Sequence, residues 1–167
     1  MEGVLNRFES EVAVLAEALR AGGTMLATAE SCTGGLIAAA CTALAGSSDW
    51  FERGFVTYSN AAKIEMLGVE PALIAVHGAV SAEVACAMAE GALARSHATW
   101  SVAVTGIAGP SGATPGKPVG TVWLALAAKD FAGRAELLQL SGDRASIREQ
   151  TVRRALQRLI AATAAQA

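Results

Sequence analysis

A serine and a cysteine stand side by side in the segment TAESCTGG, residues 28–35, and either side chain could act as a nucleophile. A strand, a turn of small residues and a helix in that order point backbone N–H groups at an anion, either a phosphate or the oxyanion of an acyl-transfer intermediate. Ser31 would then lie at the carboxyl end of the strand, where α/β folds bind ligands. The alternative is structural: a hydroxyl caps the helix, while Gly34 and Gly35 permit the turn.

A serine hydroxyl needs a base before it can attack, and the chain offers two histidines. His97 lies at the polar end of a predicted helix, and His77 lies in a predicted turn before another, so neither is favoured. A lysine whose pKa is lowered by burial can also serve as the base. The segment VTYSNAAK supplies Tyr58 and Lys63, and both could face the same sheet edge as Ser31. The alternative is a surface lysine and an interfacial tyrosine.

Cys32 is the rival nucleophile. A thiol at a helix N-terminus has a lowered pKa and is reactive. A small buried cysteine is commoner, and no histidine stands beside Cys32 in the sequence. Cys41 and Cys86 fall inside apolar helical patterns and are expected in the core.

Two further segments could bind a ligand. The loop in VTGIAGPSGATPGKPVG is rich in Gly and Pro and is either a ligand clamp or an exposed connection. Thr105 ends the strand before it, and Lys117 could pair with an anion. In SGDRASIR, Asp143 can cap the last helix, which would leave Arg144 at its start. Arg144 would then either bind a phosphate through its planar fork or be a solvated helix-end charge.

The elements that position these residues follow from the apolar pattern. Helical spacing runs from Val4 and Leu5 to Leu19, and Gly22 and Gly23 end that helix. Further helices are predicted after Thr33 to about Leu44, over 61–67 with Asn60 as cap, from Ser81 to about Arg95, and after Asp143. Strands are predicted over 24–30, 54–59, 99–106, 120–128 and 135–140. This order predicts one three-layer α/β/α domain over residues 1–167, with a sheet that is mostly parallel or mixed.

Composition narrows the function classes. The chain has 167 residues, of which 53% are hydrophobic and 17% charged, so a buried core is expected and disorder is not. The net charge of -2 gives no general attraction to nucleic acid or an anionic membrane. Three cysteines without a CxxC pair argue against a disulfide framework or a zinc site, and favour a reducing compartment. We therefore expect a cytoplasmic protein without a metal, a cofactor or a membrane span.

Taken together, the motifs resemble the C-terminal domain of the competence/damage-inducible CinA proteins. The resemblance runs from about Leu15 to Leu159, and no other CinA domain precedes it, which suggests the stand-alone form. It rests on ATAESCTGGLIAAACT, GSSDWFERGFVTYSNAAKIEMLGV, HGAVSAEVACAMAEGA, AVTGIAGPSGATPGKPVGTVW and SGDRASIREQTVRRAL. It implies an amidohydrolase that converts nicotinamide mononucleotide to nicotinic acid mononucleotide and ammonia, in a homo-oligomer, most simply a dimer.

The resemblance also implies roles for single residues. Ser31 matches the nucleophile, Lys63 its base and Tyr58 an assisting hydroxyl, in a mechanism without metal. The predicted binding residues are Cys32, Thr33, Gly34, Gly35, Thr105, Gly106, Gly109 and Arg144. One departure is Ala113, which stands where the family commonly has a glycine, so a positive φ there would strain the loop. The alternative function is a nucleotide- or phosphate-binding protein without turnover.

Overall fold

The computed structural model describes residues 3 and 6–166, so Val4 and Leu5 of the predicted first helix lie outside the described residues. The helices are α2 (Glu9–Gly22), α3 (Leu36–Thr42), α4 (Asn60–Leu67), α5 (Pro71–His77), α6 (Ala82–Ala94) and α7 (Arg144–Ala165), with 3-10 turns η1 (Asn6–Phe8) and η2 (Ser47–Asp49). The strands are β1 (Leu26–Glu30), β2 (Phe51–Val56), β3 (Trp100–Gly106), β4 (Thr121–Ala128) and β5 (Phe131–Gln139).

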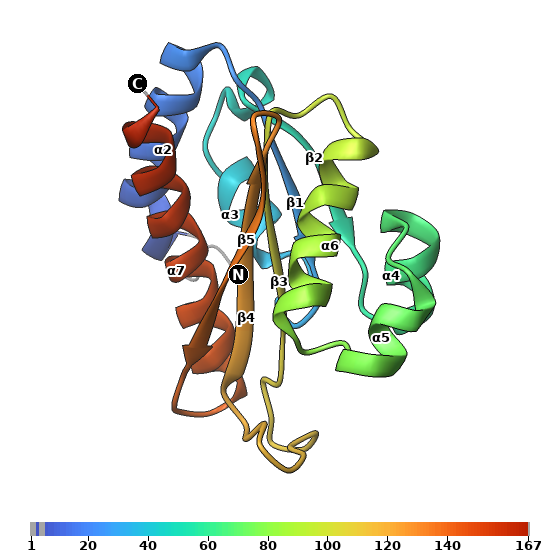
Figure 1. Cartoon of the computed structure of the whole chain (residues 1–167). Coiled ribbons are helices and arrows are strands. Elements are labelled where there is room, and N and C mark those ends of the chain that lie inside the picture. Colours follow the sequence, from blue (N-terminus) through green and yellow to red (C-terminus); the bar gives the residue numbers. More distant parts are fainter. Residues whose placement is uncertain (1–2, 4–5, 167) are drawn as a thin grey trace.

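The strands form one five-stranded sheet in the order β2-β1-β3-β4-β5. Strands β2, β1 and β3 are parallel, whereas β4 and β5 run antiparallel to their neighbours. Helices α2, α3 and α7 cover one face, and α4, α5 and α6 lie on the other (Figure 1). The predicted three-layer arrangement with a mixed sheet is therefore confirmed. The sheet is mixed because β3, β4 and β5 follow one another without a helix between them.

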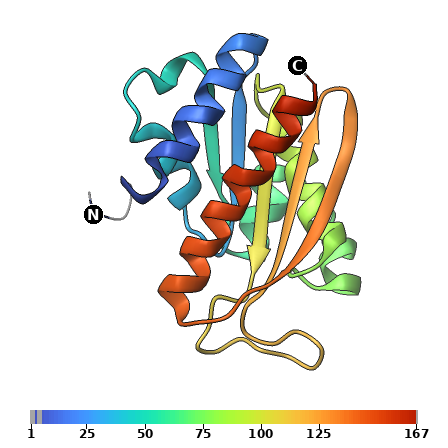
Figure 2. The ribbon, with the colours of Figure 1, turned by 90° about the vertical axis from the view of Figure 1, so that its left-hand side faces the viewer.

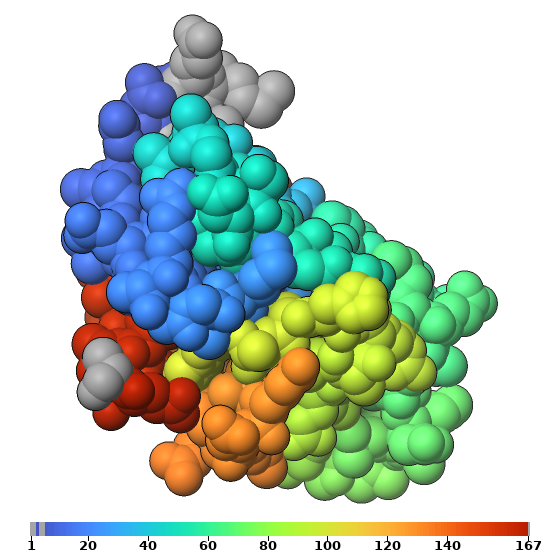
Figure 3. Space-filling view, turned by 90° about the horizontal axis from the view of Figure 1, so that it is seen from above, coloured from blue at the N-terminus to red at the C-terminus, as the bar shows by residue number. Residues whose placement is uncertain are grey.

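The two faces of the sheet carry separate apolar clusters. On one face, α2 and α7 lie side by side (Figure 2), and their buried residues pack with Ile37 of α3 and with Trp50. On the other face, Val84 and Met88 of α6 pack against alanines of β1, β3 and β4. Strands covered on both faces need nearly continuous apolar runs, which explains the sequence of β3 and β4. Viewed from above, the turn between β4 and β5 reaches the surface between the two helical layers (Figure 3).

Several predicted boundaries are wrong. Ser59, rather than Asn60, caps α4, because its side-chain oxygen accepts from the Ala62 N–H at 3.0 Å. The predicted strand over 54–59 is β2, which begins earlier and already ends at Val56. Helix α5 was not predicted; Pro71 starts it, and His77 is its last residue rather than part of a turn.

The contact between α4 and α6 depends on a glycine. A Cβ on Gly91 of α6 would overlap the backbone carbonyl oxygen of Leu67 at the end of α4. We expect Gly91→Ala to lower the free energy of unfolding by about 2–3 kcal/mol, because an extra methyl in a packed contact forces the backbone apart. Gly22→Ala is the matched control, since its Cβ would meet only the side chain of Thr24. Denaturant titrations that gave equal stabilities for both variants would contradict the prediction.

Candidate active site

The candidate nucleophile lies at the carboxyl end of the central strands. Ser31 directly follows β1, and its backbone N–H donates to the Val104 carbonyl of the adjacent strand β3 at 3.1 Å. Its side chain is 8% exposed, and its Oγ lies 3.0 Å from Nζ of Lys63. The prediction that Ser31 and Lys63 face the same sheet edge is confirmed. The pairing arises because β1 and β2 are parallel, so the segments that follow them meet at one edge.

Lys63 is enclosed by backbone. It stands in the first turn of α4, is 1% exposed, and its Nζ donates to the carbonyl oxygens of Thr57 at 2.8 Å and Tyr58 at 3.4 Å. No carboxylate forms an ion pair with it in the part of the chain that the structure describes. Burial therefore lowers the pKa of Lys63 below the ordinary lysine value. A lysine in this state can be neutral and accept a proton from the hydroxyl beside it.

The thiol of Cys32 has the opposite character. The side chain is 5% exposed, and burial raises its pKa to about 12, with the nearby carboxylate of Glu30 adding to the shift. Burial also raises the pKa of Cys41 and Cys86. A thiol that stays protonated at neutral pH is a poor nucleophile, so the geometry favours Ser31.

We expect iodoacetamide at neutral pH to leave Cys32 of the folded protein unmodified, because the reagent attacks the thiolate. Peptide mass mapping checks this, with the urea-unfolded protein as the control that must be labelled. Rapid labelling of Cys32 in the folded protein would contradict it.

The N-terminus of α3 is occupied by a side chain of the chain itself. The fully buried carboxylate of Glu30 accepts from the N–H groups of Ile37 at 2.8 Å and Ala38 at 3.0 Å. It also accepts from the hydroxyls of Thr33 at 2.7 Å and Thr28 at 3.3 Å. Glu30 therefore takes these two helix N–H groups, which are not available to a ligand anion, and the predicted role of the N–H groups of residues 32–35 stays a prediction.

The turn after Ser31 contributes unequally to the pocket. Cys32 lines it, whereas the hydroxyl of Thr33 bonds to Glu30. Gly34 and Gly35 have φ values of 59° and 98°, which a residue with a side chain rarely adopts, and neither lines the pocket. Their clearest contribution is the turn itself, as the structural alternative proposed.

The pocket beside Ser31 has a volume of about 230 Å³. Its lining residues come from five segments that are distant in sequence: Ser31, Cys32, Tyr58, Asn60, Lys63, Ala79, Val80, Thr105, Gly106, Ala108 and Arg144. Thr105 closes one wall by donating its hydroxyl to the Ala79 carbonyl at 2.9 Å. Sequence reasoning missed Asn60, Ala79, Val80 and Ala108 as pocket residues, although all four lie inside the motifs that carry the CinA resemblance.

Tyr58 and Arg144 meet at the mouth of this pocket. The Arg144 guanidinium donates to the Tyr58 hydroxyl at 3.0 Å and to the Gly109 carbonyl at 2.9 Å. Tyr58 is 61% exposed. Its hydroxyl therefore bonds to Arg144, and only its backbone carbonyl contacts Lys63. Gly109 contributes a carbonyl that holds Arg144 and does not itself line the pocket.

The remaining candidate residues lie away from Ser31 and Lys63. His77 and His97 are exposed and do not line the pocket, so neither is placed to act as the base. Lys117 donates to the His77 carbonyl at 3.0 Å. Ala113 has a negative φ, so the loop accepts alanine there without backbone strain.

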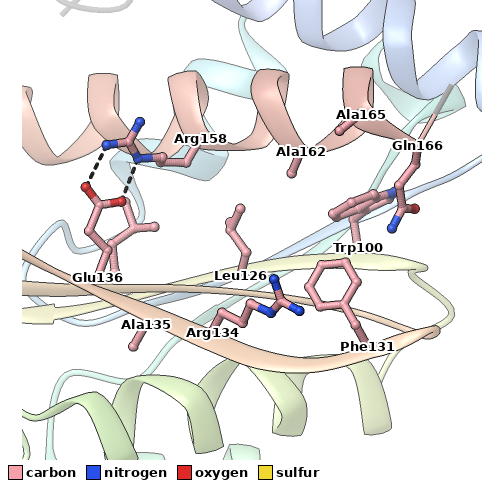
Figure 4. A pocket seen from close by; sticks show the side chains of 11 residues that line it. Trp100, Leu126, Phe131, Arg134, Ala135, Glu136, Arg158, Ala162, Ala165 and Gln166 are labelled. Atoms are coloured by element: carbon pink, nitrogen blue, oxygen red, sulfur yellow. Dashed lines mark hydrogen bonds and ion pairs between the residues drawn. The ribbon is translucent and has the colours of Figure 1, made fainter.

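A larger groove of about 450 Å³ lies at the opposite end of the sheet, between the C-terminal half of α7 and strands β4 and β5 (Figure 4). Trp100 and Phe131 lie at one end of the groove, and Arg158 pairs with Glu136 at the other end (Figure 4). The groove has neither a serine nor a lysine in its lining. The chemistry of acyl transfer is thus available beside Ser31 and not in the larger hollow.

The described residues form an α/β fold with a buried lysine against a serine at the carboxyl edge of its sheet. The chain belongs to the CinA C-terminal domain family, whose model matches residues 8–163. No helix among the described residues has the length and apolarity to span a bilayer, and they contain no group of three His, Cys, Asp or Glu side chains that could hold a metal ion.

Several known proteins are similar over most of the chain. It is 50% identical over 155 residues to the nicotinamide-nucleotide amidohydrolase PncC of Escherichia coli strain K12, covering 90% of this chain and 94% of that protein. The protein of the same name from Pseudomonas putida is 53% identical over 148 residues, covering 87% of this chain and 91% of that one. A CinA superfamily crystal structure from Klebsiella pneumoniae 700603 matches with a TM-score of 0.90 at 37% identity, covering 93% of this chain and 97% of that one.

Proposed function

We propose that this protein is a nicotinamide-nucleotide amidohydrolase that hydrolyses the carboxamide of nicotinamide mononucleotide, releasing ammonia and nicotinic acid mononucleotide. The observation that carries the proposal is the 3.0 Å contact between Ser31 Oγ and the buried Nζ of Lys63. The 50% identity to the Escherichia coli amidohydrolase over 90% of the chain supports the same reaction. A serine with a neutral lysine as its base is a known way to cleave an amide.

The contacts support the following order of proton transfers in the proposed mechanism. Neutral Lys63 takes the proton of Ser31, whose oxygen attacks the carboxamide carbon and forms a tetrahedral oxyanion. We assign the stabilisation of that charge to the backbone N–H of Cys32, the residue after the nucleophile. Lys63 returns the proton to the departing nitrogen, the C–N bond breaks, and ammonia leaves an acyl ester on Ser31. Water, deprotonated by Lys63, then hydrolyses the ester and restores the serine.

The substrate's phosphate needs a cationic partner. Arg144 is the arginine in the pocket lining, and two hydrogen bonds hold its guanidinium at the pocket mouth. A planar fork in that position suits a phosphate. We assign the phosphate to Arg144 and the pyridine ring to the wall formed by Thr105, Gly106 and Val80.

Tyr58→Phe tests what the exposed hydroxyl does. The substitution removes the hydrogen bond that holds Arg144 and leaves the Tyr58 backbone carbonyl against Lys63. We expect KM to rise by about three- to tenfold with kcat nearly unchanged, because one hydrogen bond to a charged group is worth about 1 kcal/mol or slightly more. Steady-state kinetics check this. A fall in kcat at constant KM would instead make the hydroxyl part of the proton transfer.

Turnover of nicotinamide mononucleotide is the experiment that tests the function. The purified protein is incubated with the nucleotide, ammonia is measured, and nicotinic acid mononucleotide is identified by chromatography. A non-catalytic nucleotide-binding protein would instead show a ligand-dependent rise in Tm without product. That result would overturn the proposed function.

The physiological setting forms part of the same proposal. We propose that the reaction belongs to pyridine nucleotide salvage in the cytoplasm, because its product is a nicotinate nucleotide. The three cysteines are unpaired, which suits a reducing compartment. A homodimer is proposed from the resemblance to the CinA family, and the exposed Val14 of α2 is compatible with an apolar contact between two copies. Sedimentation analysis of the purified protein measures its oligomeric state.

A further inference from the structure

The turn that carries the nucleophile, residues 31–35, is held in place by the side chain of Glu30. Glu30 precedes the turn, and its buried carboxylate accepts hydrogen bonds from the N–H groups of Ile37 and Ala38, which follow the turn in α3. The same carboxylate holds the Thr33 hydroxyl inside the turn at 2.7 Å. Glu30 forms no ion pair among the described residues. The hydrogen bonds from Thr33, Ile37 and Ala38 to Glu30 therefore fix the conformation of the backbone that follows Ser31.

Arg148 holds the same turn by hydrogen bonds to two of its backbone carbonyl groups. This half-buried arginine of α7 donates Nε to the Cys32 carbonyl at 3.2 Å and one terminal nitrogen to the Thr33 carbonyl at 3.1 Å. Arg148 also takes part in no ion pair of the described residues. Its fork thus holds two successive peptide units of the turn, 116 and 115 residues away in sequence.

These contacts set the directions of the turn's donors. The C=O and N–H of one trans peptide point in opposite directions. Arg148 holds the Cys32 carbonyl and so orients the Thr33 N–H, while the Gly34 N–H bond to the Ser31 carbonyl at 3.0 Å orients the Cys32 N–H. Within the described residues, neither the Cys32 nor the Thr33 N–H donates to a backbone carbonyl. Of these two donors, the Cys32 N–H belongs to a residue that lines the pocket, whereas Thr33 is fully buried and does not line it.

We propose that Arg148 and Glu30 are positioning residues, which hold the turn so that Ser31 and the Cys32 N–H after it are preorganised for the tetrahedral oxyanion. The proposal rests on the proposed amidohydrolase function. Neither residue lines the pocket, so they act through the turn and not by touching substrate. Preorganised donors stabilise charge that develops only in the transition state. Their loss therefore lowers kcat and leaves KM nearly unchanged.

Arg148→Ala is compared with Arg144→Ala and Arg154→Ala, which remove arginines from the same helix. We expect Arg148→Ala to lower kcat about 10²-fold with KM within about threefold. Arg144→Ala should raise KM, and Arg154→Ala, an exposed position, should match the wild type. Added millimolar guanidinium should restore part of the kcat of Arg148→Ala and change neither control, because the free cation can donate to the two vacated carbonyls.

Two conservative variants keep the proposal testable if Arg148→Ala unfolds. Arg148→Lys retains the charge but cannot fork to both carbonyls, and Glu30→Gln retains the shape but replaces an acceptor oxygen opposite the Ala38 N–H. Both should stay folded by circular dichroism with kcat lowered and KM kept. Wild-type kcat in these folded variants would overturn the positioning role. An inactive wild-type protein would instead overturn the proposed function, so the two failures are distinct.

Discussion

Ser31→Ala is expected to lower kcat for ammonia release from nicotinamide mononucleotide by about 10⁴-fold or more. The only group that the substitution removes is the hydroxyl 3.0 Å from Nζ of Lys63, so the acyl-enzyme cannot form. In serine hydrolases, loss of the nucleophile leaves only what binding and oxyanion stabilisation provide. Ammonia release under single-turnover conditions measures the loss, and calorimetric titration should show that the variant still binds the nucleotide.

Cys32→Ala is the matched control for this result. It removes the neighbouring thiol but keeps the backbone N–H that is proposed to stabilise the oxyanion. Because the thiol has a pKa of about 12 and stays protonated, we expect kcat to stay within a few-fold of the wild type. Full activity of Ser31→Ala together with loss of activity in folded Cys32→Ala would reverse the assignment of the nucleophile.

Lys63→Met is the second large effect, with kcat expected to fall about 10³-fold. Methionine keeps the length and apolar stem of the lysine but cannot accept a proton, and general base catalysis contributes about 10²–10⁴-fold. In the wild type only neutral Lys63 is active, so kcat/KM should fall tenfold per pH unit below the lowered pKa of Lys63 and level off above it. The residual rate of Lys63→Met should lack that rise.

Lys129→Met is the control, because it removes an exposed lysine. Its pH–rate profile should match that of the wild type. A wild-type profile that falls with rising pH over the neutral range would show that the ammonium, and not the amine, is the active form. It would thereby exclude Lys63 as the base.

The same residue links pH to stability. Burial lowers the pKa of Lys63 in the folded protein, whereas the unfolded chain keeps the ordinary value of 10.5. At a pH below the lowered pKa, the folded state is destabilised because it holds a buried ammonium group. This destabilisation decreases as the pH rises and is lost at about the ordinary value of 10.5. The free energy of unfolding of Lys63→Met minus that of the wild type should therefore be larger at pH 7 than at pH 10. Urea titrations at both values measure the difference.

Part of the site can be predicted from the sequence. Ser31 and Lys63 follow neighbouring strands, and parallel strands bring their carboxyl ends to one edge, so their approach follows from the βα pattern. The contacts of Glu30 could not be predicted in this way, because polar residues are common at the ends of strands and the sequence does not show what such a side chain binds. The contacts of Arg148 could not be predicted from the sequence either. Its contacts require α7 to cross the sheet beside α3, which depends on tertiary packing.

Local boundaries failed for a different reason. Ser59 and Asn60 are both good helix caps, and only the backbone conformation decides between them. Ser59 has extended φ and ψ of -88° and 161°, so its side chain can turn back to the Ala62 N–H. Helix α5 spans only seven residues, too few to show a helical period, although Pro71 at its start and Gly78 after its end are the usual signals.

The parallel ladder between β1 and β2 also makes the dyad a reporter of folding. The proposed nucleophile and its base are 32 residues apart in the sequence. They meet only when the parallel strands β1 and β2, which no hairpin connects, have paired. A slip of one residue between them would displace Ser31 from Lys63 by about 3.3 Å and turn every side chain of the strand to the other face. Non-local pairing of this kind forms slowly, because the intervening chain must first be ordered. Activity would therefore return only with chains in which the β1–β2 register is native, however much helix had already formed.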